Sequence, residues 1–436
     1  MTTTSGGTAP ADTAIPARGP AADANVASPT QAPRQHTGPR HAAGSADLSP
    51  PAATGRAATL LRQCMPAVAA YAGARLVGLV VLAVFAHRAG RPLFSLLTGW
   101  DTTWYVNVAE HGYDTSIRYV GDQLVHTNIA FFPLFPWLIR AASGVGVSPW
   151  WAAVIIANLA GLAAAWGIAM IGATLYDRRV GLILAVLWGA LPHAVVQSMG
   201  YTESLFTALC AWALWAVLDR RWLLAGGLTV AAGLTRPTVV ALIAAVGVAS
   251  VIAIVRHRGR LRDGGWRPWA AALLAPAGFA GYLIWCAAAV GRLDAYFWMQ
   301  DEGWATDVDF GATTLHELGV TATHERQLAM YVAYLVLVLA VLLLALLFFD
   351  RTAERRASVL PLLIFAGLLV FTVLVQGGIY PYAKARLLLP AFPLLIPLAT
   401  GLAAARTHVR WAVLGLLVAV SAWYGTYLTI TWHLSP

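Results

Sequence analysis

The sequence predicts an all-α polytopic membrane protein with about 11 transmembrane helices. Hydrophobic residues make up 59% of the 436 residues, charged residues only 11%, and the mean hydropathy is +0.66. A soluble domain carries about a quarter charged residues, whereas a membrane-spanning helix takes roughly 20 apolar residues in a row. The chain contains many such continuous runs. They indicate helices, because the strands of a transmembrane barrel alternate apolar and polar residues.

The N-terminal segment differs from the rest of the chain. Residues 1–60 are rich in Ala, Thr, Pro, Gly and Ser and have no apolar period, which predicts a disordered cytoplasmic tail. The first apolar run starts only near Met65, so the tail is not expected to be a signal peptide. We expect one transmembrane domain over residues 61–436.

The apolar runs define the expected spans in chain order. Several end at a pair or cluster of arginines, and two Gly-rich runs are separated by Thr235-Arg236-Pro237. The spans are expected at 65–87, 149–174, 180–198, 203–218, 222–235, 237–255, 269–290, 328–348, 358–376, 386–404 and 411–430.

The basic residues between the runs predict the orientation. With a cytoplasmic N-terminus, every basic cluster falls on the inner side, as the positive-inside rule requires. These clusters are Arg178–Arg179, Arg220–Arg221, 256–267, Arg351 to Arg356 and Arg406 to Arg410. The loops then expected on the extracytoplasmic face of the plasma membrane are 88–148, 199–202, 291–327 and 377–385.

This orientation depends on how residues 129–139 are interpreted. The run is apolar but short, carries two prolines and ends at Arg140. Counting it as a span would place every later basic cluster outside. We therefore expect an interfacial helix, which leaves a first outer loop of roughly 60 residues, and loops of that length usually carry function.

The charge and the cysteines exclude some classes of protein. The net charge of +9 comes from 29 basic and 20 acidic residues, with the basic ones in short groups between apolar runs, so nucleic acid is not expected as a partner. The cysteines lie in or beside apolar runs without motif spacing, which predicts neither a disulfide nor a zinc site. They are Cys64, Cys210 and Cys286.

The first outer loop supplies a candidate catalytic base. Asp101 follows the first span and is flanked by Trp100 and Trp104. The rings would exclude water and raise the pKa of the carboxyl group toward the range of a general base. If residues 100–112 are helical, Trp104 and His111 share a face. The alternative is an interfacial aromatic belt with an incidental carboxylate.

Three basic residues are candidates for binding an anionic group. Arg236 lies in a break in mid-membrane sequence, and Lys384 and Arg386 enter a span from its outer side. A phosphate at headgroup depth would suit all three. Snorkelling would also explain Lys384 and Arg386, and a helix kink would explain Arg236. Glu203 starts a span from outside, as a helix-start carboxylate or a substrate contact.

The second outer loop is rich in acidic residues and histidines. His316-Glu317 and His324-Glu325 are eight residues apart, not four as in a zinc-binding helix. A solvated acidic loop is therefore expected instead of a metal site, and covering a substrate is left open as its role.

Five motifs together resemble the PIG-V family of mannosyltransferases, over roughly residues 60–430. They are WDTTWYVNVAEHGYD, FFPLFPWLIRAAS, GYTESLF, AGLTRP and KARLLLPAFPLL. The resemblance implies a GT-C type fold, a polyprenyl-phosphate sugar as donor, and inverting transfer at the outer face to a glycolipid, glycan or protein. It implies Asp101 as the base and neither metal nor cofactor. It also implies that substrate is positioned by Glu110, His111, Tyr113 and Tyr201, together with the residues already named.

Two other functions fit parts of the sequence. A secondary transporter or lipid flippase would account for the spans and for Arg236, but such proteins usually carry internal repeats, and none is visible here. A non-catalytic assembly subunit would have little need for a long outer loop with clustered carboxylates.

Overall fold

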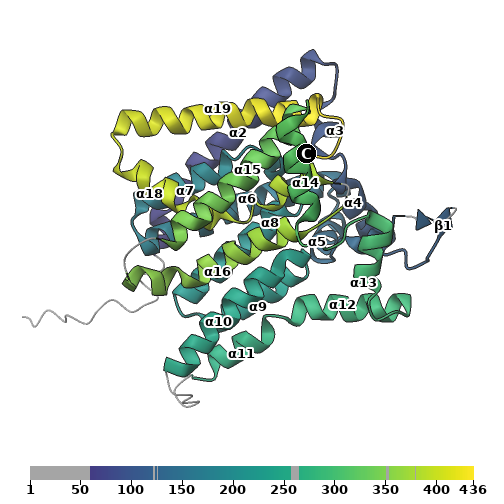
Figure 1. Ribbon diagram of the computed structural model, residues 1–436, viewed down its shortest axis with the longest axis horizontal. Helices are drawn as coiled ribbons and strands as arrows, with labels where there is room; N and C mark the ends of the chain where they lie inside the picture. The colour runs from purple at the N-terminus through teal and green to yellow at the C-terminus, as the bar shows by residue number, and fades with distance from the viewer. Residues whose placement is uncertain (1–58, 121–122, 125, 257–264, 350–352, 379) are drawn as a thin grey trace, which may run out of the picture. The chain divides into compact units, whose positions relative to one another are not determined.

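The computed structural model describes residues 59–120, 123–124, 126–256, 265–349, 353–378 and 380–436 (Figure 1). The predicted tail and most of the basic cluster 256–267 lie outside the described residues. Within them, the regular structure is helical apart from two short strands, β1 (Tyr119–Val120) and β2 (Gln123–Leu124), which pair antiparallel, and an isolated bridge between Val308 and Gln376. The predicted all-α class is confirmed.

The helices of the first half begin with one long helix and then a group of short ones. They are α2 Met65–Arg88, α3 Leu93–Leu97, α4 Asp101–His111, η1 Asn128–Ala130, α5 Leu134–Ser143, α6 Pro149–Leu175, α7 Arg178–Gly189, η2 Ala194–Ser198, α8 Glu203–Leu218 and α9 Trp222–Gly233.

The second half alternates long helices with short turns. Its helices are η3 Pro237–Val239, α10 Val240–Arg256, α11 Arg267–Leu274, α12 Ala277–Val290, α13 Ala295–Trp298, η5 Met299–Gly303, α14 Ala312–Thr323, α15 Leu328–Phe348, α16 Ala353–Val375, η6 Pro381–Ala383, α17 Lys384–Leu387, η7 Phe392–Leu395, α18 Ile396–Ala404 and α19 Thr407–Ile430.

Among the described residues, six helices are long and apolar enough to cross a membrane. A seventh span results if the pair Pro381–Leu387 and Phe392–Ala404, bent by 75°, is counted as one. The chain is thus an integral multi-pass membrane protein, although the number 11 stays a prediction. Three of the expected spans, α8, α9 and Val359–Val375, are apolar but shorter.

The expected span 180–198 is interrupted in the structure. Helix α7 ends at Gly189, and the 3-10 turn η2 begins only at Ala194. Pro192 explains the break, because proline disfavours helical backbone at the preceding residue and cannot donate a backbone hydrogen bond.

The helical core is packed through small side chains. Helix α6 buries Ala157, Ala164, Ala165 and Ala169 completely against its neighbours. Small residues let helix backbones approach closely, which is how helices associate within lipid. By contrast, α15 exposes several leucines, including Leu335 and Leu342. Exposed apolar side chains on a long helix are expected where the neighbour is lipid.

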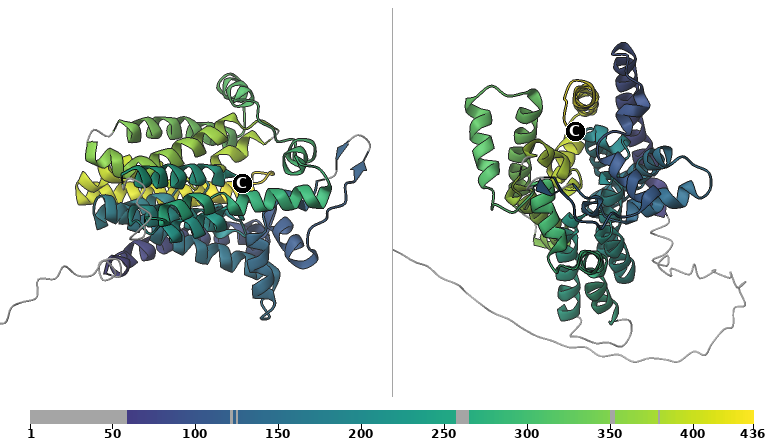
Figure 2. Two further views of the ribbon diagram at one scale, coloured as in Figure 1. Left: turned by 90° about the horizontal axis from the view of Figure 1, so that it is seen from below. Right: turned by 90° about the vertical axis from the view of Figure 1, so that its right-hand side faces the viewer.

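The predicted outer loops meet at one end of the helices. Trp104 from the first loop contacts Trp304 from the second at 5.3 Å between ring centroids. The amine of Lys384 donates to the hydroxyl of Thr314 in α14. Figures 1 and 2 show α3, α4, α5, α13 and β1 gathered at this end, while α12 runs toward it.

The helix ends next to the basic clusters lie at the opposite end, which we call the basic end. It comprises the described ends of α6, α8, α10, α15 and α18 and the described starts of α7, α9, α11, α16 and α19, and Figure 1 shows those of α10, α11, α16, α18 and α19 on its left side. The yellow helix α19 runs roughly along the same direction as the teal and green helices (Figure 2, left). Outer loops and basic turns are therefore separated as the sequence predicts; which side faces the cytoplasm stays a prediction.

Residues 129–139 do not form a span among the described helices. They contain the turn η1 and most of α5, which has 10 residues. Phe135 and Ile139 are fully buried, whereas Trp137 is 54% exposed and Arg140 is exposed. This two-faced pattern confirms the predicted short helix and is typical of a helix at a membrane interface.

Candidate functional site

Helix α4 begins at the predicted base, Asp101. The preceding residue, Trp100, has a φ of 51° and a ψ of −116°. Residues other than glycine rarely adopt this backbone conformation. Such strain costs of order 1–3 kcal/mol and persists only where the surroundings impose it. The α4 start is therefore held in place by its packing, and that packing fixes the direction of Asp101.

A close approach to the segment before α8 provides this packing. The backbone N–H of Gly200 donates to Leu97 O at 3.0 Å. A Cβ atom at position 200 would lie 2.5 Å from Thr102 Cγ2. One turn into α4, the hydroxyls of Tyr105 and Thr202 are 3.0 Å apart. Glycine at position 200 thus lets the start of α4 lie directly against residues 200–202.

Four charged side chains meet beside this contact, and we call them the ion-pair cluster: Asp101, Glu203, Arg236 and Arg386. Arg386 Nη2 lies 3.0 Å from Asp101 Oδ2, and its Nε lies 3.3 Å from Glu203 Oε1. Arg236 Nη1 lies 2.7 Å from the same Glu203 oxygen. The four side chains come from α4, α8, the turn between α9 and η3, and α17.

Further contacts fix the two arginines. Arg236 donates to Thr202 Oγ1 at 3.1 Å. Arg386 donates to Ser435 Oγ at 3.0 Å and lies over the ring of Tyr201, 5.1 Å from its centroid. The hydroxyl of Tyr201, which is fully buried, is 3.3 Å from the same Ser435 oxygen. Both guanidinium groups are therefore oriented before any substrate binds.

The two carboxylates of the cluster differ in exposure. The side chain of Asp101 is 25% exposed, whereas that of Glu203 is 1% exposed. Partial burial raises the pKa of Asp101; Arg386 opposes this rise, and the nearby carboxylate of Glu203 adds to it. Asp101 is thus the more accessible carboxylate of the cluster, and Glu203 is the buried counter-ion that contacts both arginines.

An aromatic group adjoins Asp101, and we call it the aromatic platform: Trp104, Phe131 and Trp304. Trp104 stacks on Phe131 at 5.6 Å, and Trp304 packs edge-on against both rings at 5.3 and 5.5 Å. All three rings are partly exposed. Trp104 is three residues beyond Asp101, so both side chains lie on one face of α4. A face of aromatic rings beside a reachable carboxylate suits a ring-shaped substrate with an apolar side.

Lys384 does not pair with any member of the ion-pair cluster. Its amine donates to Thr314 Oγ1 and to the backbone carbonyl of Gln376, and its side chain is buried. Lys384 thereby joins α14 of the second outer loop to the end of α16. Its role is to hold these two segments together next to the site.

The other candidates of the first outer loop do not join the ion-pair cluster. Glu110 and His111 are exposed in the last turn of α4. A rise of 1.5 Å per residue puts them about 14 Å along the helix from Asp101. The Tyr113 hydroxyl donates to Phe131 O at 2.7 Å, so this residue supports the backbone of the aromatic platform. Trp100 packs against the helical core.

Among the described residues, no group of three or more His, Cys, Asp or Glu side chains could hold a metal ion. In the second outer loop, Glu317 pairs with Arg326 at 3.2 Å, and His324 Nδ1 lies 2.8 Å from the hydroxyl of Thr323. The three cysteines are free and buried in the structure.

Sequence reasoning missed several residues of the site. Tyr105 and Thr202 lie inside the quoted motifs but carry no charge, and Ser435 lies outside every motif. Trp304 lies in a loop that the sequence marks only by its acidic residues. A tryptophan in a polar loop expected to cover a substrate was the available signal, since exposed aromatic residues often mark binding surfaces.

No protein-family model and no curated protein matches the chain. Among solved structures, it is similar to ArnT from Cupriavidus metallidurans bound to undecaprenyl phosphate, with 15% identity and a TM-score of 0.48, over 87% of this chain and 76% of that one. It is also similar to the oligosaccharyltransferase of Archaeoglobus fulgidus in the apo form, with 13% identity and a TM-score of 0.43 over 83% of this chain. The match spans only 55% of the oligosaccharyltransferase.

Proposed function

We propose that this protein is a membrane glycosyltransferase with a GT-C type fold. It moves a hexose, mannose by the sequence resemblance, from a polyprenyl phosphate to an acceptor hydroxyl at the extracytoplasmic face of the plasma membrane. The observation that carries the proposal is the pairing of reachable Asp101 with Arg386, whose guanidinium also contacts buried Glu203. The acceptor is a glycolipid, a glycan or a protein.

The proposed step is a single displacement. Asp101 takes the proton of the acceptor hydroxyl while the acceptor oxygen forms a bond to the anomeric carbon. The bond from that carbon to the phosphate oxygen breaks, and the electron pair leaves with polyprenyl phosphate. Because the acceptor attacks opposite the leaving group, the configuration inverts.

The ion-pair cluster suits the movement of charge in this step. Two guanidinium groups balance two carboxylates in the cluster. During transfer Asp101 loses its negative charge to the incoming proton, and the phosphate gains one. Arg386 lies beside Asp101 and is already oriented there by Glu203, Ser435 and Tyr201, so its positive charge is in place as the negative charge moves to the phosphate. Pre-oriented cations that meet a developing charge typically lower a barrier by several kcal/mol.

The decisive experiment measures sugar transfer in membranes from a radiolabelled polyprenyl-phosphate hexose. Asp101→Asn should lower the transfer rate by about 10²- to 10⁴-fold, the range for loss of a general base. Asp114→Asn is the matched control, because Asp114 is an exposed carboxylate of the same loop, paired with Arg118. Its transfer rate should equal that of the wild type.

A second readout separates catalysis from folding and from transport. Asp101→Asn should still bind polyprenyl phosphate and unfold at the wild-type temperature. Wild-type transfer activity in Asp101→Asn would remove Asp101 from the role of base. Movement of the lipid-linked sugar across vesicles, without transfer and independent of Asp101, would show a flippase instead.

A further inference from the structure

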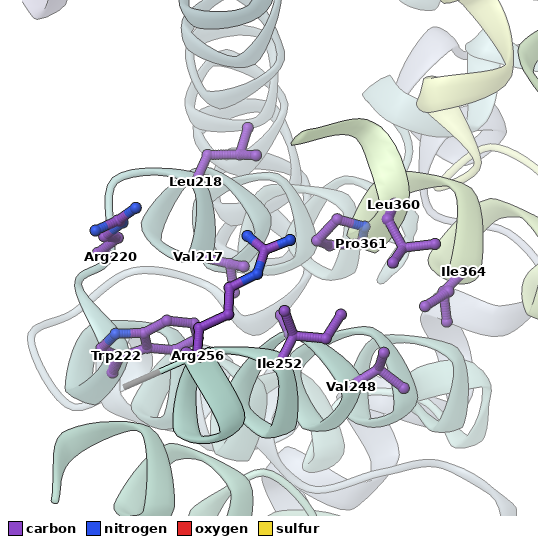
Figure 3. Close-up of a pocket in the computed structure, with 12 residues that line it drawn as sticks. Val217, Leu218, Arg220, Trp222, Val248, Ile252, Arg256, Leu360, Pro361 and Ile364 are labelled. Carbon is purple, nitrogen blue, oxygen red and sulfur yellow. The ribbon is translucent and has the colours of Figure 1, made fainter. Parts of the chain in front are cut away.

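A cavity of about 210 Å³ opens at the basic end (Figure 3). Asp101 lies at the opposite end of the helices. Its lining comes from the end of α8, the start of α9, the last turns of α10 and the first half of α16. The walls are apolar and include Val217, Ile252 and Ile364, whereas Arg220 and Arg256 supply positive charge. It thus combines an apolar interior with cationic groups.

Neither arginine of the cavity has a partner among the described residues. The nearby carboxylate Asp219 is already paired with Arg221 at 2.6 Å, and Arg221 also lies over the ring of Trp215. No ion pair or hydrogen bond within the described part of the chain uses the guanidinium of Arg220 or Arg256. Figure 3 shows the Arg256 side chain extending from α10 toward Val217 and Pro361, with Arg220 at the edge of the cavity.

The backbone of Arg220 holds its side chain at this edge. Its φ is 57°, in the left-handed region that costs a non-glycine residue about 1–2 kcal/mol. Glycine would adopt the same conformation without that cost. Replacing Arg220 with glycine therefore removes the charge while relaxing the turn, which makes it a useful variant.

We propose that this cavity binds an anionic phospholipid. The phosphate would contact Arg220 and Arg256, and an acyl chain would lie against the apolar walls formed by α10 and α16. Guanidinium groups bind phosphate in a bidentate manner, and basic pockets between transmembrane helices on the cytoplasmic side are typical sites for anionic headgroups. A water-soluble phosphate would leave the apolar walls without a contact, whereas a lipid uses both features.

The position of the cavity agrees with this ligand. It lies among the basic turns, which the sequence places on the cytoplasmic side, where anionic lipids give the membrane surface its negative potential. Each arginine near such a surface contributes about 1 kcal/mol, which is about fivefold in affinity, and two contribute about 30-fold. We therefore expect the cavity to favour phosphatidylglycerol over phosphatidylcholine by about 30-fold.

The test is lipid competition on the purified full-length chain, followed by native mass spectrometry. Phosphatidylglycerol and phosphatidylcholine with identical acyl chains are added in known ratios, and the bound fraction of each is measured. Arg220→Gly and Arg256→Gln should each lower the preference for phosphatidylglycerol about fivefold, and the double variant should abolish it. Arg178→Gln is the matched control, an exposed arginine of the basic end outside the cavity, and should leave the preference unchanged.

The apolar part of the site is tested separately. Ala253 lines the cavity and is half-buried, so Ala253→Phe should fill it and lower binding of both lipids. Unfolding temperatures without added lipid verify that each variant is folded, and Arg220→Gly should unfold no earlier than the wild type.

Four results would overturn the proposal. Equal binding of the two lipids would show that charge is not recognised, and an unchanged preference in the double variant would place the site elsewhere. Displacement of phosphatidylglycerol by millimolar inorganic phosphate would show a site for the headgroup alone. Stronger binding of polyprenyl phosphate than of phosphatidylglycerol at this cavity would assign it to a different lipid.

Discussion

Arg386 Nη2 lies 3.0 Å from Asp101 Oδ2, although one residue begins α4 and the other belongs to α17 near the end of the chain. The same guanidinium reaches Glu203 with its Nε at 3.3 Å. One side chain therefore links the reachable carboxylate to the buried one, so the ionisation of Asp101 depends on both.

The pH dependence of transfer should report the ionisation of Asp101. A general base acts when deprotonated, so kcat/KM should rise with pH through the Asp101 pKa and level off above it. Burial raises the pKa of Asp101, which places this rise above the ordinary aspartate value of about 4. Measuring kcat/KM from pH 4 to 9 checks this.

Variants of its two neighbours should move this pH profile in opposite directions. Arg386→Gln removes a cation that lowers the pKa of Asp101, so the rise should move to higher pH. Glu203→Gln removes a carboxylate that raises the pKa, so the rise should move to lower pH. A shift in the same direction in both variants would show that the profile does not report Asp101.

Gly200→Ala should displace the start of α4. The added methyl group would lie 2.5 Å from Thr102 Cγ2, and overpacking of this kind costs typically about 1–3 kcal/mol. A small displacement of a catalytic group costs on the order of 10²-fold in rate, so transfer should fall more than the yield of folded protein. Both are measured on the same membrane preparation.

A second substitution should partly reverse this effect. Thr102→Ala removes the atoms nearest to the new methyl group, so the double variant should regain activity relative to Gly200→Ala. Gly227→Ala is the control, because a Cβ atom there meets nothing within 4 Å. No recovery in the double variant would mean that the contact with Thr102 is not what positions Asp101.

Removing a ring of the aromatic platform should weaken substrate binding. Trp304→Ala loses edge contacts with Trp104 and Phe131, and such aromatic contacts contribute about 0.5–1.5 kcal/mol, or up to about tenfold. We expect KM for the sugar donor or acceptor to rise by about this factor while kcat changes less. Trp304→Phe should restore part of the loss, and Trp137→Ala, an exposed ring on α5, should have no effect.

Ser435 should act through Arg386. Ser435→Ala removes a hydrogen bond to Arg386 and a contact with the Tyr201 hydroxyl, each of which contributes about 0.5–1.5 kcal/mol. The transfer rate should fall about two- to tenfold. Tyr201→Phe keeps the ring under Arg386 but loses the hydroxyl, and its effect should not add to that of Ser435→Ala. Additive effects would mean that the two residues act independently.

The polypeptide sequence predicted the elements that local rules determine. Continuous apolar runs gave helices at nearly every expected position, and the two prolines and Arg140 correctly marked residues 129–139 as a short helix. The position of Asp101 in the sequence likewise identified it as a candidate. A carboxylate beside an apolar run is energetically costly, so it is seldom there for structural reasons alone.

Only the tertiary structure decided which candidates lie together. Lys384 and Arg386 look equivalent in the sequence, but residues two apart on a helix point to different sides, so one contacts α14 and the other contacts Asp101. Trp304 lies at the site only because the second outer loop packs against the first. An ion pair acts over a few ångströms, and no local pattern can specify which distant segments come that close; the packing of whole helices does.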